Sequence, residues 1–233
     1  MKLKGPFQKA KFIERPNRFI TLIDIGGTIY PSHLPDPGRL KELLTPGANL
    51  LVLPAPENSN RKTKYSTVMV NHHGQLISLN STLPNQFVKE AISNNQIPIF
   101  NNYSIIRPEI SIGSHRFDFL LKDPGGLEFI LEVKSVTYVK DGIAQFPDAV
   151  TLRGAKHAMA LKKLADDGKG AGILFVCQRS DAKAFQPMWD RDPKLAQAVL
   201  DAKYSGVKVW CITLNISETE VTYNAEIPVN LEL

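Results

Sequence analysis

Two charged residues lie in the middle of a mostly apolar stretch and limit how it can fold. Glu132 and Lys134 lie two positions apart in the sequence LEFILEVKSV. Alternate side chains of a strand point to opposite faces, so the odd-numbered residues share one apolar face, while Glu132 and Lys134 share the other with Ile130. A buried charge is costly unless it pairs, binds a metal ion or takes part in chemistry. The stretch therefore predicts a core strand that carries a polar site.

A second acid lies just upstream in the same kind of setting. Asp118 falls in the sequence RFDFLL, where alternation puts Phe117 and Phe119 on one face and Asp118 on the other. The sequence DPGG that follows is typical of a tight turn. We therefore expect a hairpin that brings Asp118 and Glu132 side by side, with Lys134 next to them.

These residue types suit a divalent-metal site that handles phosphodiesters. Mg²⁺ prefers carboxylate oxygens, a backbone carbonyl and water. Asp118 and Glu132 can supply the carboxylates and Val133 the carbonyl, while Glu90, on the preceding predicted helix, is a candidate outer ligand. Lys134 is expected to contact the attacked phosphate or to orient the attacking water. A bound ion would neutralise charge on the phosphate and lower the pKa of that water.

Spacing alone leaves a structural alternative open. Glu132 and Lys134 can form an ion pair on an exposed sheet face, and Asp118 can pair with Arg116. An acid followed later in the chain by Glu-x-Lys is a loose pattern.

The pattern of elements divides the chain near residue 82. Short apolar segments separated by Gly, Pro and Asn predict strands and one brief helix in the first part. We expect strands at 12–14, 19–25, 28–33, 50–53, 65–70 and 75–79, and the helix at 39–44. Short strands at regular spacing with an interrupting helix are typical of an OB-like barrel. A small sandwich is the alternative.

The second part mixes helices with strands. We expect helices at about 82–94, 149–166 and 192–205, and strands at about 103–110, 115–122, 127–136, 172–178, 207–214 and 220–223. This order predicts an α/β fold with three layers and a mixed sheet. The predicted domains are residues 1–82, a barrel that binds nucleic acid, and residues 83–233, the domain with the metal site.

Charge favours a polyanionic partner. The chain carries 28 Lys and Arg against 23 Asp and Glu, a net charge of +5. No apolar run approaches the roughly 18 residues of a membrane span, and the first residues do not resemble a signal peptide. We therefore expect a cytoplasmic protein without a membrane partner. Cys177 and Cys211 lie in apolar strands and are expected to be buried free thiols.

Several basic residues are candidate contacts for nucleic acid. The loop NRKTKY sets three basic residues beside an aromatic one, which suits a phosphate backbone and a base. Asp148 is expected to cap a helix whose Arg153, Lys156 and His157 form a phosphate clamp. A solvated loop and a solvated helix face are the alternatives. The full set is Arg39, Arg61, Lys62, Lys64, Arg116, Arg153, Lys156 and His157.

A resemblance to a known family carries the interpretation further. Asp118 followed by Glu132-Val133-Lys134 resembles the metal motif of the PD-(D/E)xK nucleases. The motifs PDPGRL, RK, NSTLPN, RFDFL, EVK, FPDAVTLRG, KH and QRSD occur in order along nearly the whole chain and resemble the sugar fermentation stimulation protein A family. One departure is HLPDPGR at 33–39, where the family usually has HCPNTGR. Arg39 is kept there, but the thiol and the amide are not.

The resemblance implies an OB-like barrel followed by a restriction-endonuclease-like domain, and a DNA-binding activity. We therefore expect a DNA-binding protein with a nuclease site that uses Mg²⁺ or Mn²⁺. The alternative is a non-cleaving DNA-binding regulator of sugar-metabolism genes whose nuclease site is vestigial. A sugar-binding barrel is a third option. The sequence leaves the number of copies open, with a homodimer as one option.

Overall fold

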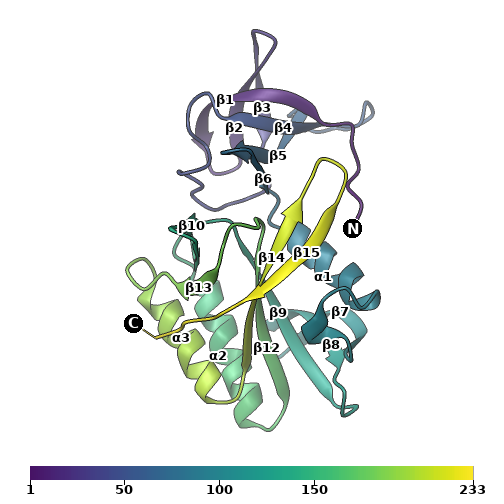
Figure 1. Cartoon of the computed structure of the whole chain (residues 1–233), viewed down its shortest axis with the longest axis vertical. Coiled ribbons are helices and arrows are strands. Elements are labelled where there is room, and N and C mark those ends of the chain that lie inside the picture. The colour runs from purple at the N-terminus through teal and green to yellow at the C-terminus, as the bar shows by residue number, and fades with distance from the viewer. Residues whose placement is uncertain (233) are drawn as a thin grey trace.

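The first part of the chain forms a closed barrel. The computed structural model describes residues 1–232, and the barrel lies above an α/β domain in Figure 1. Its strands are β1 (Gln8–Asn17), β2 (Ile20–Ile25), β3 (Thr28–His33), β4 (Asn49–Pro54), β5 (Tyr65–His72) and β6 (Gln75–Ser78). The sheet order is β3-β2-β1-β4-β5-β6, and a further pairing of β3 with β5 closes the ring. This closure confirms the OB-like barrel and excludes the sandwich.

The brief helix predicted at residues 39–44 does not form. The chain makes a turn there, in which the amides of Leu43 and Leu44 donate to the carbonyl of Leu40. Leu40 has a φ of 51°, a left-handed conformation that a right-handed helix cannot include. All three leucines still enter the barrel core, so their apolar spacing reflected burial and not a helix.

The second part is a three-layer α/β domain. Its helices are α1 (Leu83–Ser93), the 3₁₀ turn η1 (Pro98–Phe100), α2 (Leu152–Asp166) and α3 (Pro193–Tyr204). The main strands are β7 (Ser104–Ile112), β8 (His115–Lys122), β9 (Glu128–Val136), β12 (Gly170–Cys177), β14 (Lys208–Ile216) and β15 (Val221–Ile227). They form a mixed sheet in the order β15-β14-β12-β9-β8-β7, in which β12 is parallel to both β9 and β14.

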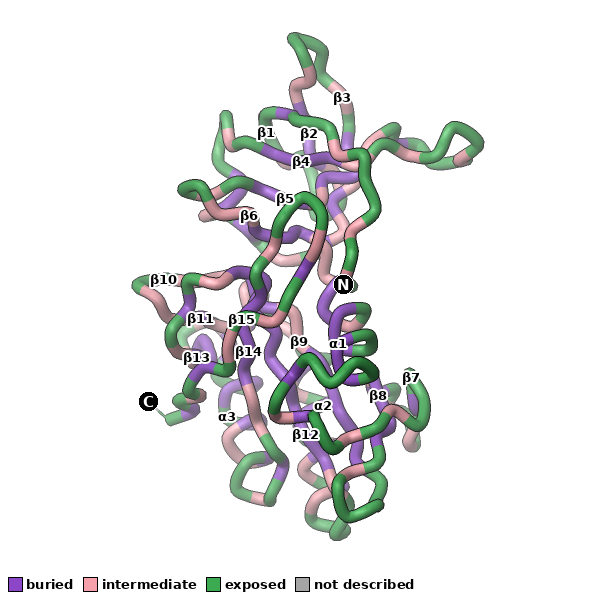
Figure 2. The backbone as a smooth tube through the Cα atoms, turned by 45° about the vertical axis from the view of Figure 1, so that its right-hand side comes forward, coloured by how far each residue is buried: buried purple, intermediate pink, exposed green. Residues whose placement is uncertain are grey.

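Helices cover both faces of this sheet, as Figure 1 shows for α2 and α3 on one side and α1 on the other. The predicted alternation holds in β9. Ile130 packs in the core under α2 and α3, whereas Leu131 and Val133 pack in the core under α1. Burial follows the layers, since the central strands are buried along most of their length in Figure 2. Cys177 and Cys211 are buried free thiols, as expected.

The alternation predicted for β8 is wrong at one position. Phe117 packs in the core on the side of α2, whereas Phe119, two residues later, packs on the side of α1. The break coincides with Glu109 in the neighbouring strand, which has a φ of 52° and lies between the pairs Pro108–Phe119 and Ile110–Phe117. The change of face in β8 therefore lies opposite a left-handed residue of β7, a conformation that a regular strand does not contain.

The sequence did not reveal a small sheet between the two parts. It consists of β10 (Val139–Lys140), β11 (Ile143–Phe146) and β13 (Ala184–Pro187), in the order β10-β11-β13. The segment after β11 leads into α2, whose N-cap is Thr151 and not Asp148, because the Thr151 hydroxyl accepts from the amide of Gly154 at 3.1 Å.

Asp148 instead ties the barrel to the α/β domain. Its Oδ2 accepts from the Leu40 amide of the barrel at 2.6 Å, and its Oδ1 accepts from Arg191 at 3.0 Å. A second tie joins Gln75 of β6 to Ser180, with 2.6 Å between the amide nitrogen and the hydroxyl. The first tie holds the barrel segment around residues 36–40 against the α/β domain, and the second holds β6.

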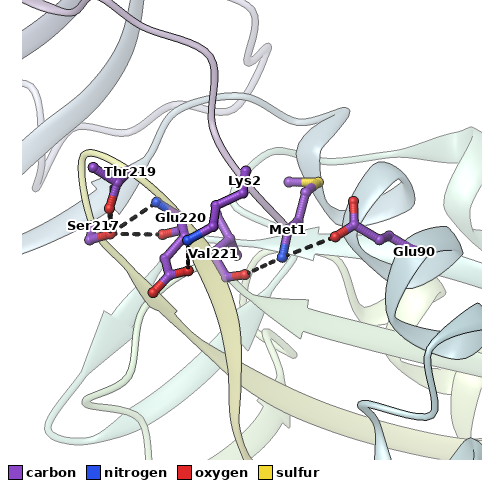
Figure 3. A network of polar contacts seen from close by, with 7 residues as sticks. All are labelled: Met1, Lys2, Glu90, Ser217, Thr219, Glu220 and Val221. Carbon is purple, nitrogen blue, oxygen red and sulfur yellow. Dashed lines mark hydrogen bonds and ion pairs between the residues drawn. The ribbon is translucent and has the colours of Figure 1, made fainter.

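The first residues of the chain pack on the second domain, although residues 1–82 were predicted as one unit. Figure 3 shows the amino group of Met1 between the Val221 carbonyl at 2.9 Å and the Glu90 carboxylate at 3.2 Å. Lys2 donates to Glu220 at 2.7 Å in the same network. The chain therefore crosses α1 and β15 before it enters the barrel.

The close packing of the central sheet gives a first prediction. A Cβ added to Gly172 of β12 would lie 2.7 Å from the ring of Trp210 and 2.9 Å from the ring of Phe129. We expect Gly172→Ala to lower the free energy of unfolding by about 1–3 kcal/mol in urea titration, since the two rings must shift. Combining it with Phe129→Leu should recover part of the loss. If the losses of free energy caused by Gly172→Ala and Phe129→Leu simply add in the double variant, the clash with the Phe129 ring is not the cause of the first loss.

Candidate metal centre

Asp118 lies where two neighbouring strands separate. The backbone ladder between β8 and β9 ends at the pair Phe119–Leu131. Beyond it the Asp118 carboxylate bonds to the next strand, because its Oδ2 accepts from the Val133 amide at 2.7 Å. Its Oδ1 accepts from the Asn85 side chain of α1 at 2.6 Å. The two bonds fix the carboxylate in the opening between the strands.

Glu132 is held beside it from the opposite layer. The side chain is buried, and its Oε1 bonds to Nδ1 of His157 on α2 at 2.6 Å and forms an ion pair with Lys134. Its Oε2 is also buried but has no hydrogen-bond partner within residues 1–232. A buried carboxylate oxygen without a partner is costly, and a cation would remove that cost.

The bonds around His157 indicate its tautomer. Nε of Arg153 donates to Nε2 of His157 at 3.4 Å, so Nε2 is the accepting nitrogen. In a neutral ring the proton then lies on Nδ1, which donates to Glu132. His157 therefore orients Glu132.

Burial and charge separate the pKa values of the two acids. Burial, together with repulsion from Glu132, raises the pKa of Asp118 to about 6, although the Val133 amide, Lys134 and Asn85 oppose the rise. Burial also raises the pKa of Glu132, but the bonds from His157 and Lys134 outweigh it and leave that pKa below its usual value. Glu132 is thus ionised at neutral pH, and charge repulsion between the two acids favours a bound cation.

The alternative of ordinary ion pairs on an exposed sheet face agrees with the structure only in part. Glu132 does pair with Lys134, but the pair is buried and not on an exposed sheet face. Asp118 does not pair with Arg116, whose closest acid is Glu109 at 3.8 Å. The arrangement is therefore an enclosed polar site.

The proposed ligand set is smaller than expected. Glu90 lies 46% exposed in the ion pair with the amino group of Met1, so the structure does not bring it to the two acids. Within residues 1–232 no group of three or more His, Cys, Asp or Glu side chains could hold a metal ion. Asp118 and Glu132, with the Val133 carbonyl as a candidate, remain as the protein oxygens. Such a set leaves most positions to water, as is usual for Mg²⁺.

The candidate nucleic-acid contacts fall into two groups. Arg153 and Lys156 are exposed on α2, where Arg153 donates to His157, the partner of Glu132, and Arg116 is exposed on β8. Arg61, Lys62 and Lys64 lie in the loop between β4 and β5, and Arg39 lies in the barrel segment next to Asp148. His157 is different, because it is 5% exposed and bonded to Glu132, so it is not available as a phosphate contact.

Sequence reasoning missed Asn85 as a functional residue. It is the last residue of NSTLPN and lies in the first turn of α1, and as a neutral amide on a helix surface it carries no local signal of a metal site. Only the tertiary fold shows that this turn faces β8.

Comparisons with known proteins agree with this architecture. Residues 13–79 match the family model "SfsA N-terminal OB domain", and residues 82–220 match "Sugar fermentation stimulation protein RE domain". A sugar fermentation stimulation protein homolog of Chloroflexus aurantiacus is 40% identical over 97% of this chain and 86% of its own length. Another, of Clostridium botulinum strain Langeland, is 39% identical over the whole of both chains.

A solved structure is similar as well. Pyrococcus furiosus SfsA in complex with Ca²⁺ has a TM-score of 0.88 and 29% sequence identity, over 99% of each chain. The similarity covers the barrel and the α/β domain together. Within residues 1–232, the structure contains no helix long and apolar enough to cross a membrane.

Proposed function

This chain belongs to the sugar fermentation stimulation protein family, and we propose that it is a DNA-binding protein that hydrolyses phosphodiester bonds with a divalent metal ion. The observation that carries the proposal is that Asp118 and Glu132, on neighbouring strands, lie close enough to repel each other electrostatically, with Lys134 paired to Glu132. A DNA substrate also agrees with the cytoplasmic location expected from the sequence.

The residues fit a hard divalent cation. Asp118, Glu132 and the Val133 carbonyl would hold Mg²⁺ or Mn²⁺, and the unpartnered Oε2 of Glu132 supports this. The similar Pyrococcus furiosus protein was solved in complex with Ca²⁺, which also prefers oxygen ligands. When bound, the ion would supply charge neutralisation at the phosphate and a lower pKa for the attacking water.

The surrounding residues position the reacting groups. Asn85 and the Val133 amide keep the Asp118 oxygens in place, while His157 keeps Glu132 in place. The Lys134 amine, now paired with Glu132, is the cationic donor nearest to the acids and would contact a phosphate oxygen or orient the water.

Exposed basic residues on both domains would hold the DNA backbone. Arg153 and Lys156 are exposed on α2, Arg116 is exposed on the strand that carries Asp118, and Arg61 and Lys62 are exposed on the barrel. Such contacts release counterions, so affinity should fall steeply as salt rises. Affinity that stays flat between low and moderate salt would exclude phosphate contacts as the basis of binding.

The direct test is a cleavage assay on single- and double-stranded DNA with Mg²⁺, Mn²⁺ or a chelator. We expect cleavage with one or both metals and none with chelator. Absence of cleavage on every DNA form in both metals would reject the nuclease.

A non-cleaving DNA-binding regulator of sugar-metabolism genes is the second candidate. It is favoured by the small ligand set, because within residues 1–232 no third acidic side chain joins Asp118 and Glu132. In that case chelator and Asp118→Asn would both leave salt-dependent DNA binding intact, and no metal would produce cleavage.

The bond from His157 to Glu132 gives a further prediction. We expect His157→Ala to weaken Mn²⁺ binding, measured by calorimetry, by about 10–100-fold, because a ligand loses its orienting partner. His115→Ala is the matched control, since its ring lies 5.8 Å from that of His157 but bonds to neither acid. Equal effects of the two substitutions would show that His157 serves packing only.

A further inference from the structure

A cleft lies between the barrel and the α/β domain, directly beside the candidate metal centre. Its volume is about 320 Å³, and Lys134 forms part of its wall. The end of β9 and the segment between β11 and α2 provide one side, and Arg18 and the segment of Asp36 from the barrel provide the other. The bonds of Asp148 to Leu40 and Arg191 fix these two sides relative to each other.

The walls combine apolar surface with a few polar groups. The apolar part includes Val136, Phe146, Pro147 and the half-buried Ala149, with Val150 at the exposed rim. Small-molecule sites of about 300–1,000 Å³ commonly have this character, in which apolar walls bind a ring and a few polar groups orient it. The cleft lies at the lower end of that range and suits a single planar group.

Two polar groups in the cleft are only partly satisfied. Asp36 accepts the Gly38 amide with its Oδ1 at 2.7 Å, and its Oδ2 takes no hydrogen bond within residues 1–232. The Gln145 side chain likewise makes no hydrogen bond to the described part of the chain, although its backbone amide bonds to Tyr138. A carboxylate oxygen and an amide can together pair with the donor and acceptor edge of a nucleobase.

On the basis of the proposed function, we propose that this cleft holds one unpaired nucleobase next to the phosphodiester at the metal centre. A base in a duplex has its pairing edge occupied and must be unstacked before it can enter, which costs energy that a single strand does not spend. Because Lys134 borders both the cleft and the acids, the base belongs to a nucleotide adjoining the reacting phosphate. The preferred substrate therefore carries a single-stranded segment.

Binding measured without metal tests this separately from cleavage. We expect fluorescence anisotropy in chelator to show at least about tenfold tighter binding of single-stranded DNA than of a duplex of equal length and salt. Ala149→Trp fills the cleft and should remove this preference while duplex binding stays unchanged. Leu152→Trp, 69% exposed and outside the cleft lining, is the matched control and should keep it.

A second readout follows the base itself. A 2-aminopurine scanned along the single strand should change its fluorescence at one position in the complex, and Gln145→Ala should reduce that change. Gln145→Ala also replaces Ala149→Trp if circular dichroism shows that the larger side chain prevents folding.

Equal affinity for the two DNA forms, or an unchanged preference in the cleft variant, would overturn the inference. A single-strand preference without any cleavage would support the nucleobase cleft and reject the nuclease. Cleavage without a single-strand preference would support the nuclease and reject the nucleobase cleft.

Discussion

Replacing Asp118 with Asn should lower the rate of DNA cleavage by about a thousandfold or more, because a metal-assisted step loses several kcal/mol of stabilisation with its ligand. The fold should survive the change. Both partners of the Asp118 carboxylate, the Val133 amide and Asn85, are donors. An amide at position 118 can accept from Val133 with its oxygen and donate to Asn85 once that side chain turns its own oxygen toward it.

Two measurements separate loss of catalysis from loss of structure. DNA affinity in chelator should stay within about twofold of the unaltered protein, because the basic residues that contact phosphate are unchanged. Glu90→Gln is the matched control, since this acid pairs with the amino group of Met1 and should leave cleavage unchanged. If Asp118→Asn still cleaves DNA, the Asp118 carboxylate is not needed for the reaction. If Glu90→Gln loses cleavage, Glu90 is a metal ligand after all.

Asp118 and Glu132 could be recognised as site residues from the sequence because charged side chains are unexpected in strands that are otherwise mostly apolar. Glu132 stands in the middle of a mostly apolar strand, and a tight turn fixes its distance along the hairpin from Asp118. Such local patterns need no knowledge of distant segments. For the same reason the barrel, the mixed sheet and the three long helices were predicted correctly, whereas the brief helix at 39–44 was not, and the small sheet of β10, β11 and β13 was not foreseen.

What the sequence could not give depends on residues that meet only in the folded chain. Asn85 and His157 come from helices on opposite faces of the sheet, and each bonds to a different acid. Asp148 looked like a helix cap because it precedes α2, yet it bonds to Leu40 of the barrel, 108 positions earlier in the chain. Leu40 and Glu109 both have a left-handed backbone, which leucine and glutamate rarely adopt and a sequence pattern does not predict.

The site should also make the metal-free protein less stable as the pH rises from about 4 to about 6. Burial and repulsion from Glu132 raise the pKa of Asp118 from 3.8 to about 6. The folded protein therefore holds this proton over a range in which the unfolded chain has released it, so the free energy of unfolding falls as pH increases. Integrated over the whole range, the loss is about 3 kcal/mol, and Asp118→Asn should not show it.

The difference in free energy of unfolding between the unaltered protein and Asp118→Asn isolates the effect of the Asp118 carboxyl group. Glu132 has a lowered pKa, so its contribution is present above its unfolded pKa and is lost only on acidification below about 4.5. This contribution of Glu132 is present in both the unaltered protein and Asp118→Asn, so to first order it cancels from the difference between their free energies of unfolding. Urea titrations in chelator should therefore show Asp118→Asn gaining on the unaltered protein between pH 4 and about pH 6. Adding Mn²⁺ at neutral pH should reverse the order, because only the protein with Asp118 binds the ion tightly. A difference that does not vary with pH would mean that burial does not shift the pKa of Asp118, and the electrostatic case for a cation would lose its main support.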